Sequence, residues 1–136
     1  MTHANGRVAL VTGASRGIGE AIARGLAAQG YRVAATYHSS EQRALDLQAS
    51  VKDAGGVLSL HRGDVAMADD VERIFGEATG IYGQVDILVN NAGITRDGLA
   101  MRMSDDDWDA VLDLNLRGAF LCSRAALRGM LRRRWG

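Results

Sequence analysis

The chain has 136 residues, which is enough for one domain of ordinary size and excludes a large multidomain assembly within this sequence. Hydrophobic residues make up 47% and charged residues 24%, a balance that excludes intrinsic disorder and permits a buried core. Because 16 Lys and Arg balance 16 Asp and Glu, no net charge draws the whole molecule toward nucleic acid or an anionic membrane.

We expect neither a targeting signal nor a membrane span. The polar stretch 1–7 leads into the apolar run Val8–Val11, which is far shorter than the roughly 20 residues that cross a bilayer. The single cysteine, Cys122, lies in an apolar run and has no partner for an internal disulfide, which suits a packing role in a reducing compartment. We therefore predict a cytoplasmic protein without membrane or nucleic-acid partners and without a metal site.

Apolar runs of strand length alternate with longer segments of helical period, the pattern of βαβ units around a parallel sheet. The expected strands are Val8–Val11, 33–36, a run from Val57 that is closed by Gly63, and 85–89. Apolar positions three and four residues apart predict helices from Ile18 to near Gly30, over 41–54 and over 69–82.

A last helix is expected to begin after Ser104, because acidic Asp107 follows three residues later, as in capped helices. Its apolar positions continue toward Leu131. In a right-handed parallel sheet such a helix returns the chain to a further strand, and none follows before Gly136. The prediction is one domain over residues 1–136, with four strands, four helices and an incomplete sheet.

The motif TGASRGIG, residues 12–19, lies between the first strand and the first helix, the context that a phosphate-binding loop requires. Gly13 can adopt the angles of a tight turn, Gly17 lets the main chain approach a pyrophosphate, and Gly19 lets the helix pack close to the sheet. The free N–H groups at the helix start would face the phosphates. A glycine-rich turn without a ligand is the alternative interpretation, and the GxxxGxG spacing favours the ligand.

Together with NNAG, residues 90–93 after the fourth strand, this motif resembles the classical short-chain dehydrogenase/reductase family, over essentially the whole chain. The resemblance implies an α/β fold, a Rossmann-type doubly wound parallel sheet with strand order 3-2-1-4, and a nicotinamide cofactor. It implies cofactor contacts for Gly13, Ala14, Ser15, Arg16, Gly17, Ile18, Gly19, His38, Asp64, Val65, Asn91, Ala92 and Gly93.

The end of the second strand favours NADP over NAD. Domains that prefer NAD place an acidic side chain there to bind the ribose 2′-hydroxyl, and here no acid occurs before Glu41. In the family, a basic residue at the place of Arg16 commonly pairs with the 2′-phosphate. A solvated loop arginine is the alternative interpretation of Arg16.

The resemblance implies distinct roles for four of the remaining residues. Asp64 would accept a hydrogen bond from the adenine amino group and Val65 would lie against the ring, whereas Asp64 as a plain cap of a turn or helix is the alternative. Asn91 would lie near the nicotinamide ribose. Asn115 would be the asparagine of the catalytic tetrad, at a helix kink whose backbone carbonyl holds a water; the alternative is a buried asparagine that ties two helices together.

The other three members of that tetrad, a serine, a tyrosine and a lysine, are absent from these 136 residues. A phenol with a pKa of about 10 needs an adjacent positive charge to act near neutrality, and the family supplies it with YxxxK. The three tyrosines are followed four residues later by Ala35, Glu41 and Asp86, and the only lysine is Lys52. We therefore expect a truncated chain that holds the cofactor half of a reductase and is inactive by itself.

The stretch NNAGITRDGLAMRMSDDDWDAVLDLNL, residues 90–116, is similar to 3-oxoacyl-acyl-carrier-protein reductases of fatty acid synthesis. This implies NADPH-dependent reduction of a 3-oxoacyl thioester, acyl carrier protein as a partner, and a homotetramer in the complete form. The family's carrier-docking arginine falls at Arg128, whereas attraction to a helix C-terminus explains Arg132, Arg133 and Arg134 equally well.

Three alternatives remain open. The chain could be an inactive cofactor-binding or interaction module, an acetoacetyl-CoA reductase, or another short-chain dehydrogenase. A sugar epimerase of the extended family is disfavoured by GxxxGxG in place of GxxGxxG.

Overall fold

A computed structural model describes residues 4–136, and residues 1–3 of the polar stretch 1–7 lie outside the described part. The fold is built on one parallel sheet with the order β3-β2-β1-β4, which confirms the predicted order and fold class. The strands are β1 (Val8–Val11), β2 (Arg32–Tyr37), β3 (Val57–Arg62) and β4 (Ile87–Val89).

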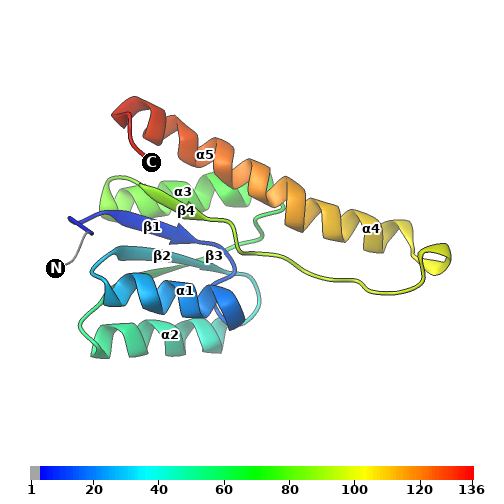
Figure 1. The fold of residues 1–136 in the computed structure, drawn as a ribbon, viewed down its shortest axis with the longest axis horizontal. Helices are drawn as coiled ribbons and strands as arrows, with labels where there is room; N and C mark the ends of the chain where they lie inside the picture. The colour runs from blue at the N-terminus through cyan, green and yellow to red at the C-terminus, as the bar shows by residue number, and fades with distance from the viewer. Residues whose placement is uncertain (1–3) are drawn as a thin grey trace.

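Helices cover both faces of this sheet (Figure 1). One face is covered by α1 (Gly17–Ala28) and α2 (Glu41–Asp53), and the other by α3 (Ala68–Tyr82) and α5 (Gly118–Arg133). The central strand β1 is fully buried, and its side chains alternate between the two layers. Leu10 packs with the α3 and α5 core, and Val11 with the α1 and α2 core. An all-apolar strand is what such a two-sided position requires.

The fourth strand is shorter than predicted, because it begins at Ile87 and not at residue 85. The buried Asp86 accounts for the difference. Its carboxylate accepts a hydrogen bond of 2.9 Å from the Val8 N–H, a group that the strand ladder would otherwise bond. Arg133 reaches the same end of the sheet, where it donates to the Val85 carbonyl at 2.7 Å.

The predicted last helix is three segments and not one. It consists of α4 (Asp105–Leu112), a π-helical turn (Asp113–Arg117) and α5, and a short 3-10 turn (Ala100–Arg102) precedes it. Its predicted start is confirmed, since the Ser104 hydroxyl accepts from the Asp107 N–H at 3.1 Å. Figure 1 shows α4 extending beyond the carboxyl ends of the strands. None of the helices in the described part is both long and apolar enough to cross a membrane.

Candidate functional site: a cleft at the carboxyl ends of the strands

The loops that follow the four strands meet at the carboxyl end of the sheet, because the strands are parallel. These loops surround a cleft of ≈ 540 Å³. Eleven of its nineteen lining residues come from the predicted glycine loop, NNAG and the turn after β3. The predicted residues that line it are Gly13, Ser15, Arg16, Gly17, Ile18, His38, Asp64, Val65, Asn91, Ala92 and Gly93. Ala14 and Gly19 are buried behind this surface and do not line it.

The glycine loop has the backbone that the motif predicts. Gly13 has φ +62°, and a Cβ there would lie 2.9 Å from the Ala92 Cα. Gly17 has φ +60° and faces open space, so its main chain is accessible to a ligand at the start of α1. Helix α1 begins at this point, and its first N–H groups, with the positive end of the helix dipole, suit an anion such as a pyrophosphate.

Thr12 and Asn91 join the loop after β1 to the loop after β4. The Thr12 hydroxyl accepts from the backbone N–H groups of Asn91 and Ala92, at 3.0 and 2.9 Å. In return, the Asn91 side-chain amide donates to the carbonyls of Thr12 and Gly13, at 3.1 and 3.0 Å. These bonds fix two cleft walls that lie far apart in the sequence. Sequence reasoning assigned no role to Thr12, although a threonine at the end of an apolar strand was the available signal.

Two arginines line the cleft, Arg16 from the glycine loop and Arg43 from the first turn of α2, and His38 lines it just after the end of β2. The one acidic residue among the lining residues, Asp64, belongs to the turn after β3. Arg43 was missed in the sequence, because its position in the first turn of α2 is recognised only once that helix is placed beside the cleft. The two guanidinium groups offer charge-assisted hydrogen bonds to an anionic group.

Asp64 and Val65 enter the cleft from the turn between β3 and α3. The Asp64 Oδ1 accepts from the Ala66 N–H at 2.9 Å, so Asp64 caps the turn, as the alternative interpretation of this residue predicts. The carboxylate still has accepting capacity toward the cleft. Val65 is mostly buried, and Gly118 at the start of α5 packs closely against it. The turn-capping role of Asp64 is therefore compatible with the predicted adenine contact.

Asn115 lies in the π-helical turn, where a departure from α-helical geometry was expected. Its side chain does not tie two helices together, so that alternative is wrong. It accepts from the Ile94 N–H at 2.8 Å and donates to the Ile94 carbonyl at 2.9 Å. Asn115 also lines a second cleft of ≈ 560 Å³, which shares Arg16, Asn91 and Gly93 with the first. Its catalytic role stays a prediction.

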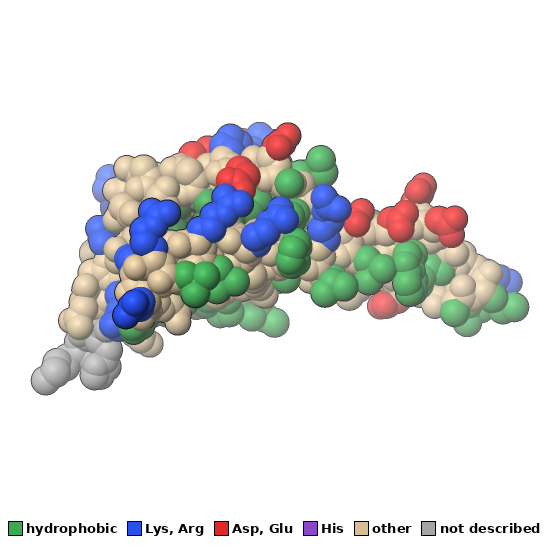
Figure 2. Space-filling model, turned by 90° about the horizontal axis from the view of Figure 1, so that it is seen from above, with side chains coloured by type: hydrophobic (Ala, Val, Ile, Leu, Met, Phe, Trp, Pro, Cys, Tyr) green, Lys and Arg blue, Asp and Glu red, His purple; other side chains and the backbone are tan. Residues whose placement is uncertain are grey.

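The remaining predicted or reactive side chains lie outside the cleft. Arg128 is exposed on α5 and pairs with Glu72 at 3.5 Å. Figure 2 shows a row of basic side chains along one side of the molecule. Lys52 lies in the last turn of α2. Burial raises the pKa of the Cys122 thiol to about 11, which keeps it protonated and unreactive near neutrality.

Comparisons with known proteins agree with this architecture. A model of the family described as short chain dehydrogenase matches residues 7–136. The chain is 46% identical, over all its 136 residues, to a 3-oxoacyl-[acyl-carrier-protein] reductase of Synechocystis sp., of which it covers 55%. It is 48% identical over 128 residues, 94% of its length, to the 3-oxoacyl-[acyl-carrier-protein] reductase FabG of Staphylococcus aureus, of which it covers 52%. The chain thus spans about half the length of the curated relatives it matches.

Solved structures with the same arrangement include two that contain NADP. A metagenomic short-chain oxidoreductase in complex with NADP aligns with a TM-score of 0.92 at 36% identity, over 98% of this chain and 60% of that protein. A short chain dehydrogenase from Burkholderia cenocepacia in complex with NADP aligns with a TM-score of 0.89 at 42% identity, over 93% of this chain and 51% of that one.

Proposed function

Because the chain belongs to the short-chain dehydrogenase family, we propose that it binds NADPH in the cleft and supplies the cofactor-binding half of a reductase of 3-oxoacyl thioesters. The bound dihydronicotinamide would supply a hydride for reduction of the 3-oxo group to a 3-hydroxyl group. The protein's own contribution is the binding site: the start of α1 would hold the phosphates, and the hydrogen-bonded loops of Thr12 and Asn91 form a wall of the same cleft.

The observation that carries the choice of NADPH is that two arginines, Arg16 before α1 and Arg43 in the first turn of α2, line the cleft. Residues 36–40, which line it at the end of β2, include no carboxylate. A 2′-phosphate would gain charge-assisted hydrogen bonds from these arginines, whereas a free 2′-hydroxyl would find no acidic acceptor.

The test is the affinity of the purified protein for NADPH and NADH, measured by cofactor fluorescence. We expect tighter binding of NADPH, and a loss of about tenfold in NADPH affinity for Arg16→Ala, with little change for NADH, since one charge-assisted contact is removed. Arg24→Ala is the matched control, because Arg24 lies on α1, the helix that Arg16 precedes, but pairs with Glu20 at 2.9 Å, outside the cleft. Equal affinity for the two cofactors would contradict the assignment.

The proposed substrate is a thioester on acyl carrier protein. The support is the similarity of residues 90–116 to reductases of that class and an exposed arginine, Arg128, for an acidic carrier. Acetoacetyl-CoA is the competing substrate, so both thioesters belong in the assay of a form that carries the full tetrad. The result that would favour an acetoacetyl-CoA reductase is faster reduction of the coenzyme A thioester, with no change in this preference in Arg128→Ala. We place this activity in the cytoplasm, in a homo-oligomer.

These 136 residues alone are proposed to bind NADPH without turning over substrate. The reason is chemical: no tyrosine is followed four residues later by a lysine, so none has the cationic partner that YxxxK supplies. Mixing the purified protein with NADPH and an acetoacetyl thioester should leave the absorbance of NADPH unchanged. Steady oxidation of NADPH would show that another group delivers the proton.

A further inference from the structure

The turn between β3 and α3 brings Asp64 into the cleft. Two side chains of helix α3 bind the backbone of this part of the chain, one at Asp64 and one at Arg62. The Asp70 Oδ2 accepts a hydrogen bond of 2.8 Å from the Asp64 N–H. The Arg73 Nη2 donates a hydrogen bond of 2.6 Å to the carbonyl of Arg62, the last residue of β3. We call Asp70 and Arg73 the α3 clamp. Gly63 lies between the two residues that these bonds hold.

Gly63 has little room for a side chain, because atoms of α3 lie close to it. A Cβ at Gly63 would lie 2.9 Å from the Ile74 Cδ1 and 3.0 Å from the Arg73 Nη2. On the opposite side, the Gly63 N–H donates to the Tyr37 carbonyl at the end of β2, at 2.9 Å. The turn is therefore fixed against β2 on one side and against the α3 clamp on the other.

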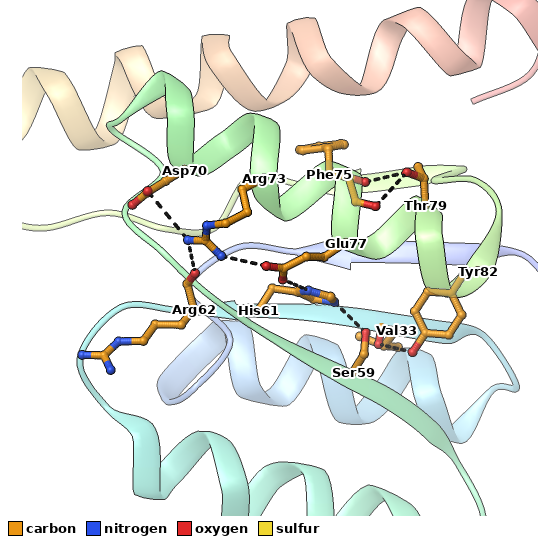
Figure 3. A network of polar contacts seen from close by, with 11 residues as sticks. Val33, Ser59, His61, Arg62, Asp70, Arg73, Phe75, Glu77, Thr79 and Tyr82 are labelled. Atoms are coloured by element: carbon orange, nitrogen blue, oxygen red, sulfur yellow. Dashed lines mark hydrogen bonds and ion pairs between the residues drawn. The ribbon is translucent and has the colours of Figure 1, made fainter.

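The α3 clamp is itself attached to a buried residue of β3, as Figure 3 shows. Arg73 donates to the Glu77 Oε1 at 2.9 Å, and the other carboxylate oxygen of Glu77 lies 2.8 Å from the Nδ1 of His61. The His61 side chain is only 1% exposed, and its Nε2 lies 2.7 Å from the Ser59 hydroxyl. The chain of contacts thus runs from the core of β3, along one face of α3, to the backbone of Asp64.

We propose that Asp70 and Arg73 are positioning residues for the adenine end of the cofactor, because they fix the direction in which Asp64 presents its carboxylate to the adenine amino group. The inference rests on the proposed NADPH function. A purely structural role, such as interaction of Asp70 with the dipole of α3, would act on stability and would be shared by the neighbouring Asp69, which lies in the same first turn.

The experiment compares NADPH with its deaminated analogue, nicotinamide hypoxanthine dinucleotide phosphate in reduced form, which lacks the adenine amino group. Dissociation constants are measured for the wild-type protein and for Asp70→Ala, Asp70→Asn, Arg73→Met and Asp69→Ala. Asp69→Ala is the matched control for charge and helix position. Asp70→Asn keeps a side-chain oxygen that can accept from the Asp64 N–H, and thermal unfolding of each variant verifies that it is folded.

We expect the wild-type protein to bind NADPH about fivefold more tightly than the deaminated analogue, the value of one hydrogen bond. In Asp70→Ala and Arg73→Met this ratio falls toward one, because the affinity for NADPH drops while the affinity for the analogue stays. Asp70→Asn and Asp69→Ala keep the wild-type ratio. Should Asp70→Ala not fold, Arg73→Met gives the same comparison.

Two outcomes would overturn the inference while the proposed function stands. One is a wild-type protein that binds NADPH and the analogue equally well. The other is a loss of affinity in Asp70→Ala that is the same for both ligands. A wild-type protein that binds neither ligand would contradict the proposed function itself, and the inference with it.

Discussion

Gly19 is the residue of the glycine loop with the least room for a side chain. A Cβ at this position would overlap the Gly13 carbonyl oxygen and the Asn91 side-chain amide. Both atoms belong to the bonded walls of the cleft, since the Asn91 amide donates to the Gly13 carbonyl at 3.0 Å. Gly19 therefore serves the close contact of α1 with the loops after β1 and β4.

We predict that Gly19→Ala lowers the free energy of unfolding by about 2–4 kcal/mol, because backbone atoms must move to admit the methyl group. Urea unfolding followed by circular dichroism measures the change. The expected affinity for NADPH falls as well, since the displaced atoms are those that shape the cleft.

Gly25→Ala provides the control on the same helix. A Cβ there meets nothing within 4 Å, and alanine is favoured over glycine inside a helix by about 1 kcal/mol. The two substitutions should therefore change stability in opposite directions. Equal effects would mean that Gly19 acts through helix propensity alone.

At this scale the sequence predicted the residues of the loop but not all of their partners. TGASRGIG indicates where a phosphate would lie, because the demands on Gly13 and Gly17 are local to the turn. The role of Thr12 depends on Asn91, 79 residues away, and no local pattern reports such a contact. Arg43 was missed for the same reason, since it reaches the cleft only through the packing of α2.

Among the elements, β3 and α3 share a contact that depends on pH. Burial raises the pKa of Glu77, but hydrogen bonds from His61 and Arg73 outweigh this effect, so its pKa lies below the ordinary value of 4.5. The ionised carboxylate therefore stabilises the fold above pH 4.5, and this contribution disappears as the pH falls through the lowered pKa.

We predict that Glu77→Gln reduces the difference in unfolding free energy between pH 7 and pH 3. The effect should be about 0.5 kcal/mol, because a side chain that is 40% exposed is screened by water. Urea unfolding at several pH values measures it. Glu72→Gln removes the same charge from an exposed position of α3 and should leave the pH dependence closer to that of the wild type. Identical curves for the two variants would contradict the prediction.

The helix after Ser104 shows why element boundaries were harder to predict than the elements. Ser104 and Asp107 mark the start correctly, since a cap is a local signal. The π-helical turn coincides with Asn115, whose side chain bonds both backbone groups of Ile94. That partner lies 21 residues earlier, in a loop without regular structure, so the apolar pattern alone predicted one continuous helix.

For the molecule as a whole, the unusual surface is the apolar side of the π-helical turn and α5. Leu116, Phe120 and Leu131 are 66, 58 and 73% exposed. Figure 2 shows apolar side chains beside the basic row on this side of the molecule. Exposed apolar surface of this extent favours association, which supports the proposed homo-oligomer.

We predict that the protein self-associates and that the double substitution Leu116→Gln and Phe120→Gln weakens this association. Sedimentation velocity over a range of concentrations measures it. Leu45→Gln is the control, because Leu45 is also exposed but lies on α2. A wild-type protein that stays monomeric at high concentration, or equal effects of the two sets of substitutions, would contradict the prediction.

The strand order 3-2-1-4 was implied by the family resemblance, and the apolar pattern of the first strand agrees with it. Val8–Val11 is apolar at every position, which suits only a strand with neighbours and helices on both sides. That strand is β1, and it lies between β2 and β4. The shortened β4 was not predictable in this way, since it depends on a buried carboxylate that replaces part of the ladder.

The central place of β1 has a consequence during synthesis on the ribosome. Its partner β2 follows within a few tens of residues, but the Asp86 carboxylate that bonds Val8 lies 78 residues later. At a translation rate of about 5–20 residues per second, one edge of β1 stays unpaired for roughly 4–16 s, until β4 has been synthesised. During that interval the nascent chain exposes an unpaired strand edge, so chaperone binding to chains arrested before residue 86 should exceed that to longer ones.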